Sequence, residues 1–213
     1  AKVVVYYSDG NVAFTTGTTN VGTFTLNDED DFTADMAGAY SAVKLNRTFN
    51  AGWGTVVLPV SITQSSVETY FGTGAKFYQL SAYDTTTGEL TFSEVTSGDM
   101  VAGTPYLINL PAAISDGLTF QSVTLVADEH PVTINGAQFK GNYDAGMSME
   151  GKIGVTPQGK LAVGSSSSTM KAFRSYIEVP AGSPSPRILV TDGETTGIKY
   201  VLDDIDSVVN GVN

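Results

Sequence analysis

Apolar residues recur at every second position within many short segments of the chain, which is the pattern of half-buried β-strands. Glycine, proline, asparagine and aspartate, the residues that favour turns, separate these segments at intervals of about eight to twelve residues. No long segment has helical periodicity. The pattern predicts an all-β fold, specifically an antiparallel β-sandwich, with a β-barrel as the alternative.

Two pairs of predicted strands are joined by turns of recognisable chemistry. Residues 77–83 and 90–95 flank a polar turn that begins with Asp84 and ends with Gly88. Residues 153–155 and 161–163 flank a second turn, in which Pro157 presets φ and Gly159 accepts the left-handed conformation. Each pair is therefore expected to form a hairpin.

The alternation is interrupted in the segment 118–125. The apolar phase slips by one position between Phe120 and Val123. A β-bulge, in which one strand carries an extra residue, would restore the phase and bend the strand.

One or two short helices are expected among the strands. Val67, Tyr70 and Phe71 have helical spacing, and Gly72 is a suitable stop. Phe32 and Met36 follow a run of acidic residues that would match the positive end of a helix dipole.

The only candidate boundary in the chain lies near residue 43. Residues 1–43 are expected to form an N-terminal β lobe, either separate from or part of the same domain, and residues 44–213 a β-sandwich module. No long linker rich in proline or glycine marks the boundary.

Composition excludes several kinds of partner. The chain has 22 acidic and 11 basic residues and a net charge of -11, which would repel nucleic acid and anionic lipid. No apolar run approaches the roughly 20 residues that cross a bilayer, so we expect no direct membrane insertion. The oligomeric state is left open.

Catalytic motifs are missing from the sequence. His130 is the only histidine and there is no cysteine, so catalytic triads and zinc sites lack their usual residues. We therefore assign no catalytic residue and expect a protein that is not an enzyme. Glycoside hydrolysis stays open, because two well-placed carboxylates suffice for it.

Two kinds of ligand site are suggested by side-chain type. Trp53 and Tyr83 could stack on sugar rings, although a core position is the stronger interpretation for the single tryptophan. The sequence indicates no organic cofactor. Calcium is the one metal left open, with Asp28, Asp30 and Asp31 as hard oxygen ligands, although acidic runs are usually solvated surface.

Five blocks of the sequence resemble a β-rich module of secreted and surface proteins in Bacteroidetes. The most specific block, Leu45 to Pro59, is similar to the pattern LxRTFxAGWNTLxLPF of that family, and the resemblance covers roughly residues 44 to 200. Val60 departs from the pattern, which has an aromatic residue there. The other four blocks are residues 71–76, 100–108, 139–143 and 171–176.

The resemblance implies an exported module of adhesin-like proteins, located outside a Gram-negative cell or on its outer membrane after removal of a signal peptide. It also implies O-glycan acceptor sites, for which Thr85 and Ser207 fit a loose three-residue signal. We expect a non-catalytic surface module for adhesion, glycan binding or assembly, with a glycan or a surface protein as partner. A carbohydrate-active hydrolase and a structural spacer or export domain are the alternatives.

Overall fold

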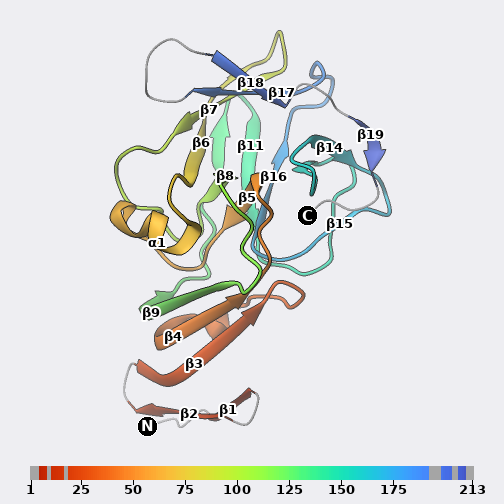
Figure 1. Cartoon of the computed structure of the whole chain (residues 1–213). Helices are drawn as coiled ribbons and strands as arrows, with labels where there is room; N and C mark the ends of the chain where they lie inside the picture. Colours follow the sequence, from red (N-terminus) through yellow and green to blue (C-terminus); the bar gives the residue numbers. More distant parts are fainter. Residues whose placement is uncertain (1–4, 9–10, 17–18, 192–197, 203–205, 210–213) are drawn as a thin grey trace.

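The fold of this chain, a computed structural model, consists almost entirely of β-strands (Figure 1). The structure describes residues 5–8, 11–16, 19–191, 198–202 and 206–209, with side chains from residue 22 to residue 191. Its strands form three large sheets and a small ribbon. The prediction of an all-β fold with short helices is confirmed.

The N-terminal sheet lies at the bottom of Figure 1 and has the strand order β1-β2-β3-β4-β9. Its hairpin of β1 and β2 is antiparallel, whereas β3 and β4 run parallel. β4 crosses the predicted boundary at residue 43 without interruption. The strands are β1 (Val5–Ser8), β2 (Asn11–Thr16), β3 (Thr19–Asn27), β4 (Gly38–Asn46) and β9 (Leu118–Leu125).

The β6 sheet has the order β18-β17-β7-β6-β8-β5. β6 and β7 form the predicted hairpin around Asp84 and Gly88, and β17 joins β7 in parallel. The strands are β18 (Ile198–Leu202), β17 (Arg187–Thr191), β7 (Glu89–Glu94), β6 (Lys76–Asp84), β8 (Pro105–Leu110) and β5 (Gly52–Val57).

The β16 sheet has the order β10-β11-β16-β13-β14-β19. It contains the second predicted hairpin, β13 and β14, with Ile153 opposite Val163. Its strands are β10 (Val132–Ile134), β11 (Ala137–Asn142), β16 (Arg174–Glu178), β13 (Ile153–Val155), β14 (Leu161–Gly164) and β19 (Asp206–Val209). The separate ribbon consists of β12 (Met147–Ser148) and β15 (Thr169–Met170).

The helical segments are short. α1 (Val67–Phe71) ends at Gly72, whose φ is +91°, as the sequence predicts. The region after the acidic run contains only the 3₁₀ turn η1 (Ala34–Met36), and η2 (Gln64–Ser66) precedes α1. Within the described residues, no helix is both long and apolar enough to cross a bilayer.

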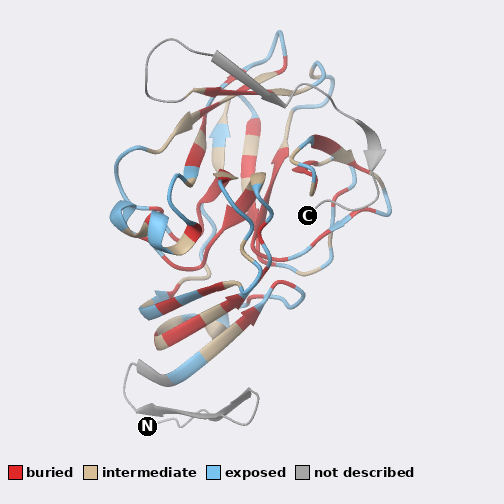
Figure 2. Ribbon diagram, viewed as in Figure 1, coloured by how far each residue is buried: buried red, intermediate tan, exposed pale blue. Residues whose placement is uncertain are grey.

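Two large hydrophobic cores hold the described parts of the sheets together (Figure 2). One core lies between the β6 sheet and the β16 sheet, where the rings of Phe92 and Phe139 meet edge to face at 5.1 Å. These two sheets form the predicted sandwich. The other core joins the N-terminal sheet to β5, β8 and α1, with Val43, Val56 and Phe71 among its fully buried side chains.

The phase slip in β9 is not produced by an inserted residue. Ala42 of β4 lies opposite Gln121 and Tyr40 opposite Val123, so the register is the same on both sides of the slip. Ser122 instead has a left-handed φ of +52°. The prediction of a β-bulge is therefore wrong, because neither strand carries an extra residue. The left-handed conformation of Ser122 turns the side chain of Val123 back toward the core.

Gly103 lies where two loops approach each other closely. Its N–H donates to Leu58 O at 2.8 Å, and its carbonyl accepts from the N–H of His130 at 2.9 Å. A Cβ at this position would be 1.9 Å from Asp128 O, and φ is +76°. Only glycine fits here without movement of the backbone.

Replacing Gly103 with alanine should therefore destabilise the fold strongly. Gly98 is the matched control, because its φ is +86° but a Cβ there would have no neighbouring atom within 4 Å. We expect Gly98→Ala to lower the free energy of unfolding by about 1 kcal/mol. Gly103→Ala should lower it by about 3 kcal/mol or more. Urea unfolding measures both, and equal losses would contradict the close approach.

Candidate functional site

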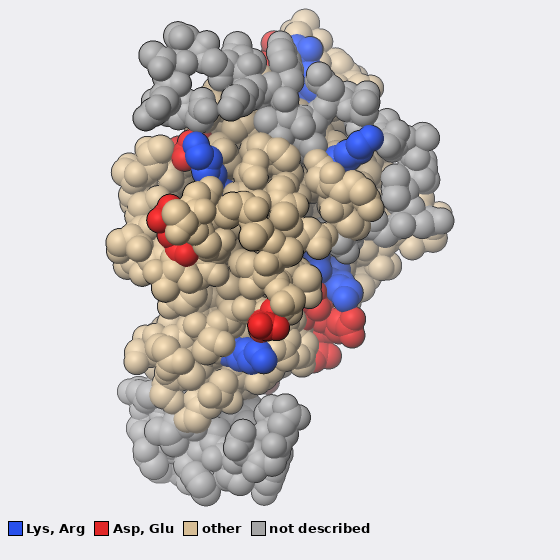
Figure 3. All heavy atoms as spheres, in the orientation of Figure 1, with Lys and Arg blue, Asp and Glu red and all other residues tan. Residues whose placement is uncertain are grey.

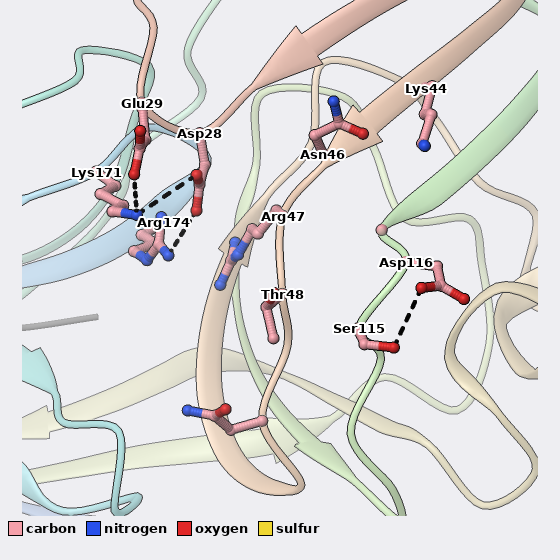
Figure 4. Close-up of a pocket in the computed structure, with 12 residues that line it drawn as sticks. Asp28, Glu29, Lys44, Asn46, Arg47, Thr48, Ser115, Asp116, Lys171 and Arg174 are labelled. Atoms are coloured by element: carbon pink, nitrogen blue, oxygen red, sulfur yellow. Dashed lines mark hydrogen bonds and ion pairs between the residues drawn. The ribbon is translucent and has the colours of Figure 1, made fainter.

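A cleft of about 680 Å³ opens where the N-terminal sheet meets the sandwich (Figure 4). The turn after β3, the end of β4, the loop before β9 and the start of β16 supply its walls. Most of the face in Figure 3 is uncharged. Acidic and basic side chains lie together on it at the right, just below the middle of the view. The lining residues are Asp28, Glu29, Lys44, Asn46, Arg47, Thr48, Asn50, Ser115, Asp116, Gly117, Lys171 and Arg174.

Arg47 lies in the middle of the cleft and is 7% exposed. Its Nη1 donates to Phe173 O and its Nη2 donates to Thr55 O at 2.6 Å, while the guanidinium lies 4.3 Å from the centre of the Phe49 ring. Burial holds the pKa of Arg47 well below its ordinary value; nearby Arg174 adds to this effect and Asp28 opposes it. The packing fixes a buried cation at the base of the cleft.

Arg174 lies beside it and pairs with the carboxylate of Asp28. Nη2 of Arg174 is 2.8 Å from Asp28 Oδ2, and Nη1 donates to Ala172 O at 3.0 Å. Burial lowers the pKa of Arg174, while the hydrogen bond and charge of Asp28 act in the opposite direction. Lys171 extends the cluster toward solvent, with Nζ 2.7 Å from Glu29 Oε1 and 3.8 Å from Asp28 Oδ1.

The opposite wall is polar, and none of its side chains makes an ion pair with another residue that the structure describes. Lys44 and Asn46 project from one side of β4, and Nδ2 of Asn46 donates to Asn27 Oδ1 at 2.9 Å. The hydroxyl of Ser115 donates to Asp116 Oδ1 at 3.3 Å. Gly117 brings this loop against β4, since a Cβ there would be 2.1 Å from Leu45 O.

Trp53 lies in β5, between two glycines of the same strand. Its half-buried ring packs against the sandwich core, with its centre 5.3 Å from that of Tyr78. Trp53 also lines a small pocket of about 30 Å³ that shares Arg47, Thr48, Asn50 and Arg174 with the cleft. Trp53 is thus both a core residue and a neighbour of the cleft.

Tyr83 does not fit the predicted role in ligand stacking. It is 2% exposed and belongs to the core of the sandwich. The alternation of β6 directs its ring inward, and no face of the ring is open to a sugar.

The three candidate calcium ligands have separate partners. Asp28 pairs with Arg174, Asp30 Oδ2 accepts from Asn27 Nδ2 at 2.9 Å, and Asp31 Oδ1 accepts from the N–H of Ala145 at 2.7 Å. In the part of the chain that the structure describes, no group of three or more acidic, histidine or cysteine residues could hold a metal ion. The structure does not bring the predicted triad together.

Thr85 is exposed in the turn between β6 and β7. The neighbouring Asp84 caps this turn, because its Oδ1 accepts from the N–H groups of Thr86 at 2.8 Å and Thr87 at 3.3 Å. These hydrogen bonds lower the pKa of Asp84. Ser207 lies outside the residues whose side chains the structure describes.

Of the residues that line the cleft, only Asp28 was predicted from the sequence as a site residue, and the two buried arginines are among those that the sequence did not predict. The alternation of apolar and polar residues around β16 predicts that Arg174 faces solvent. In the structure the arginine is only 4% exposed. Phe173, directly before β16, has a left-handed φ of +63°, which breaks the alternation there. A pattern of polar and apolar residues carries no signal for a buried ion pair across 146 positions.

The pair of Asp28 and Arg174 should be important for stability. Asp28→Asn leaves the buried guanidinium without its carboxylate, and we expect a loss of about 3 to 5 kcal/mol in the free energy of unfolding. Asp30→Asn makes the same change in charge at an exposed neighbour and should cost about 0.5 kcal/mol or less. Urea unfolding at pH 7 compares the variants, and a small effect at Asp28 would show that the pair is dispensable.

No protein-family model matches the chain, and no curated protein or solved structure is significantly similar to it.

Proposed function

We propose that this protein is a non-catalytic surface module and that its cleft binds a glycan. The observation that carries the proposal is the chemistry of the lining, which consists of hydroxyl, amide and charged side chains around one concave site. Sugar rings carry hydroxyl groups that both donate and accept hydrogen bonds, and such a lining matches them in both roles. The resemblance to exported Bacteroidetes modules supports a location on the cell surface.

The polarity of the cleft argues against an apolar ligand. Pockets for drug-like molecules and most cofactors are mainly apolar with a few polar groups. Here Thr48 and Asn50 are exposed and line both the cleft and the small pocket that the half-buried Trp53 also lines. A sugar bound by these two side chains would extend toward the tryptophan, whose exposed part could contact a ring face.

The partners of the cleft carboxylates favour binding over hydrolysis. Glycosidases need two carboxyl groups that face the scissile bond from opposite sides. Asp28 and Glu29 are neighbours on one turn and are engaged by Arg174 and Lys171. Asp116, on the other wall, accepts from Ser115. Carboxylates held by such contacts are suited to a structural role and not to attack on a glycosidic bond.

A hydroxyl deletion in the cleft tests the proposal. Thr48→Val preserves the shape of an exposed side chain but removes its hydroxyl, and it should weaken binding of a glycan identified on an array by about three- to tenfold. Thr124→Val is the matched control, an exposed position of β9 that lies opposite Ala39 and does not line the cleft, and it should leave the affinity unchanged. Calorimetry measures affinity, and a reducing-end assay measures turnover.

Each result of this experiment has a distinct meaning. Saturable binding that weakens in Thr48→Val, without release of reducing ends, supports the proposal. Turnover would instead establish the hydrolase. Absence of binding across neutral and acidic glycans would contradict the proposal and favour a spacer or an assembly domain.

A further inference from the structure

The charge of the cleft is opposite to that of the chain. Eleven basic residues stand against 22 acidic residues in the sequence as a whole. The cleft, in contrast, is lined by the four cations Lys44, Arg47, Lys171 and Arg174 and the three acids Asp28, Glu29 and Asp116. Because salt screens charges beyond about 8 Å at physiological ionic strength, a ligand in the cleft interacts mainly with these local charges.

The cations differ in whether an acid already neutralises them. Arg174 pairs with Asp28, and Lys171 lies 2.7 Å from Glu29. Lys44 makes no ion pair with any other residue that the structure describes, although its side chain borders the cleft. One wall is therefore balanced, while the positive charge of Lys44 remains for a ligand.

Arg47 is also without a carboxylate in direct contact. Its two hydrogen bonds go to the neutral carbonyl groups of Thr55 and Phe173, and its buried Nε has no hydrogen-bond partner. A guanidinium carries five N–H donors and binds carboxylate and sulfate oxygens well. The packing against Phe49 holds it in place, so little side-chain entropy would be lost on binding.

We infer that the glycan bound by this cleft is anionic and that its acidic groups, carboxylate or sulfate, interact with Lys44 and Arg47. This inference rests on the proposed function and specifies its ligand. Asn46, which lies between these two cations in Figure 4, can donate to the ring oxygens or hydroxyls beside the charged group. Asp116 limits affinity, since its negative charge borders the same cleft.

Two single substitutions of opposite effect test the inference. Lys44→Gln removes the cation and should weaken binding of the anionic ligand about tenfold. Asp116→Asn removes a repelling charge from an exposed side chain and should strengthen binding about threefold. A gain in affinity is informative because damage to the fold does not produce it. Lys76→Gln and Asp99→Asn make the same changes in charge away from the cleft and should leave affinity unchanged.

The ligands are compared in matched pairs. Oligogalacturonate and its methyl ester differ in the carboxylate charge, and dextran sulfate and dextran differ in the sulfate. Calorimetry of the whole protein with all four probes should show binding of one charged member and at least tenfold weaker binding of its neutral counterpart. Binding of oligogalacturonate identifies a carboxylate ligand, and binding of dextran sulfate identifies a sulfated one.

The outcomes separate this inference from the proposed function. Equal affinity for a charged probe and its neutral counterpart, with no effect of Lys44→Gln, would overturn the inference but leave glycan binding in place. Binding of a charged probe that Lys76→Gln weakens as much as Lys44→Gln would also overturn it, because the contact would then be diffuse. Failure of all four probes and of a wider glycan array would overturn both.

Discussion

The hydrogen bonds of Arg47 lie where all three large sheets come together. Arg47 directly follows β4 of the N-terminal sheet and donates to Thr55 O, in β5 of the β6 sheet. It also donates to Phe173 O, immediately before β16. A buried guanidinium without these acceptors would be costly, so the three elements are held in one relative position.

Further contacts strengthen the same junction between β5 and β16. The hydroxyl of Thr55 donates to Ser175 O at 2.9 Å and accepts from the N–H of Ser175 at 3.0 Å. The N–H of Val57 donates to Phe173 O at 3.2 Å. The left-handed φ of Phe173, which costs about 1 kcal/mol or more in a residue other than glycine, is maintained by this network. Strain and buried charge are thus concentrated beside the cleft.

In the glycan-binding role proposed for the cleft, side chains that stabilise the fold would also hold the ligand site in shape. Arg174 and Asp28 connect the turn after β3 to β16, while Lys171 and Glu29 continue the pairing at the surface. Because the buried pair of Arg174 and Asp28 fixes the base of the cleft, a ligand of the proposed kind would meet a preorganised site. Lys44 and Asp116 make no ion pair with another residue that the structure describes, and in the proposed role they would set the preference for charge.

The sequence by itself determined the local elements of this protein. Period-two alternation and turn residues such as Gly88 and Gly159 were sufficient for the hairpins, and Gly72 for the end of α1, because these signals act between near neighbours. Only the tertiary structure decided the parallel pairing of β3 with β4, the burial of Tyr83 and the pairing of Asp28 with Arg174. Such features depend on contacts between residues distant in the chain, and a polar side chain is buried or exposed according to the partner that folding brings to it.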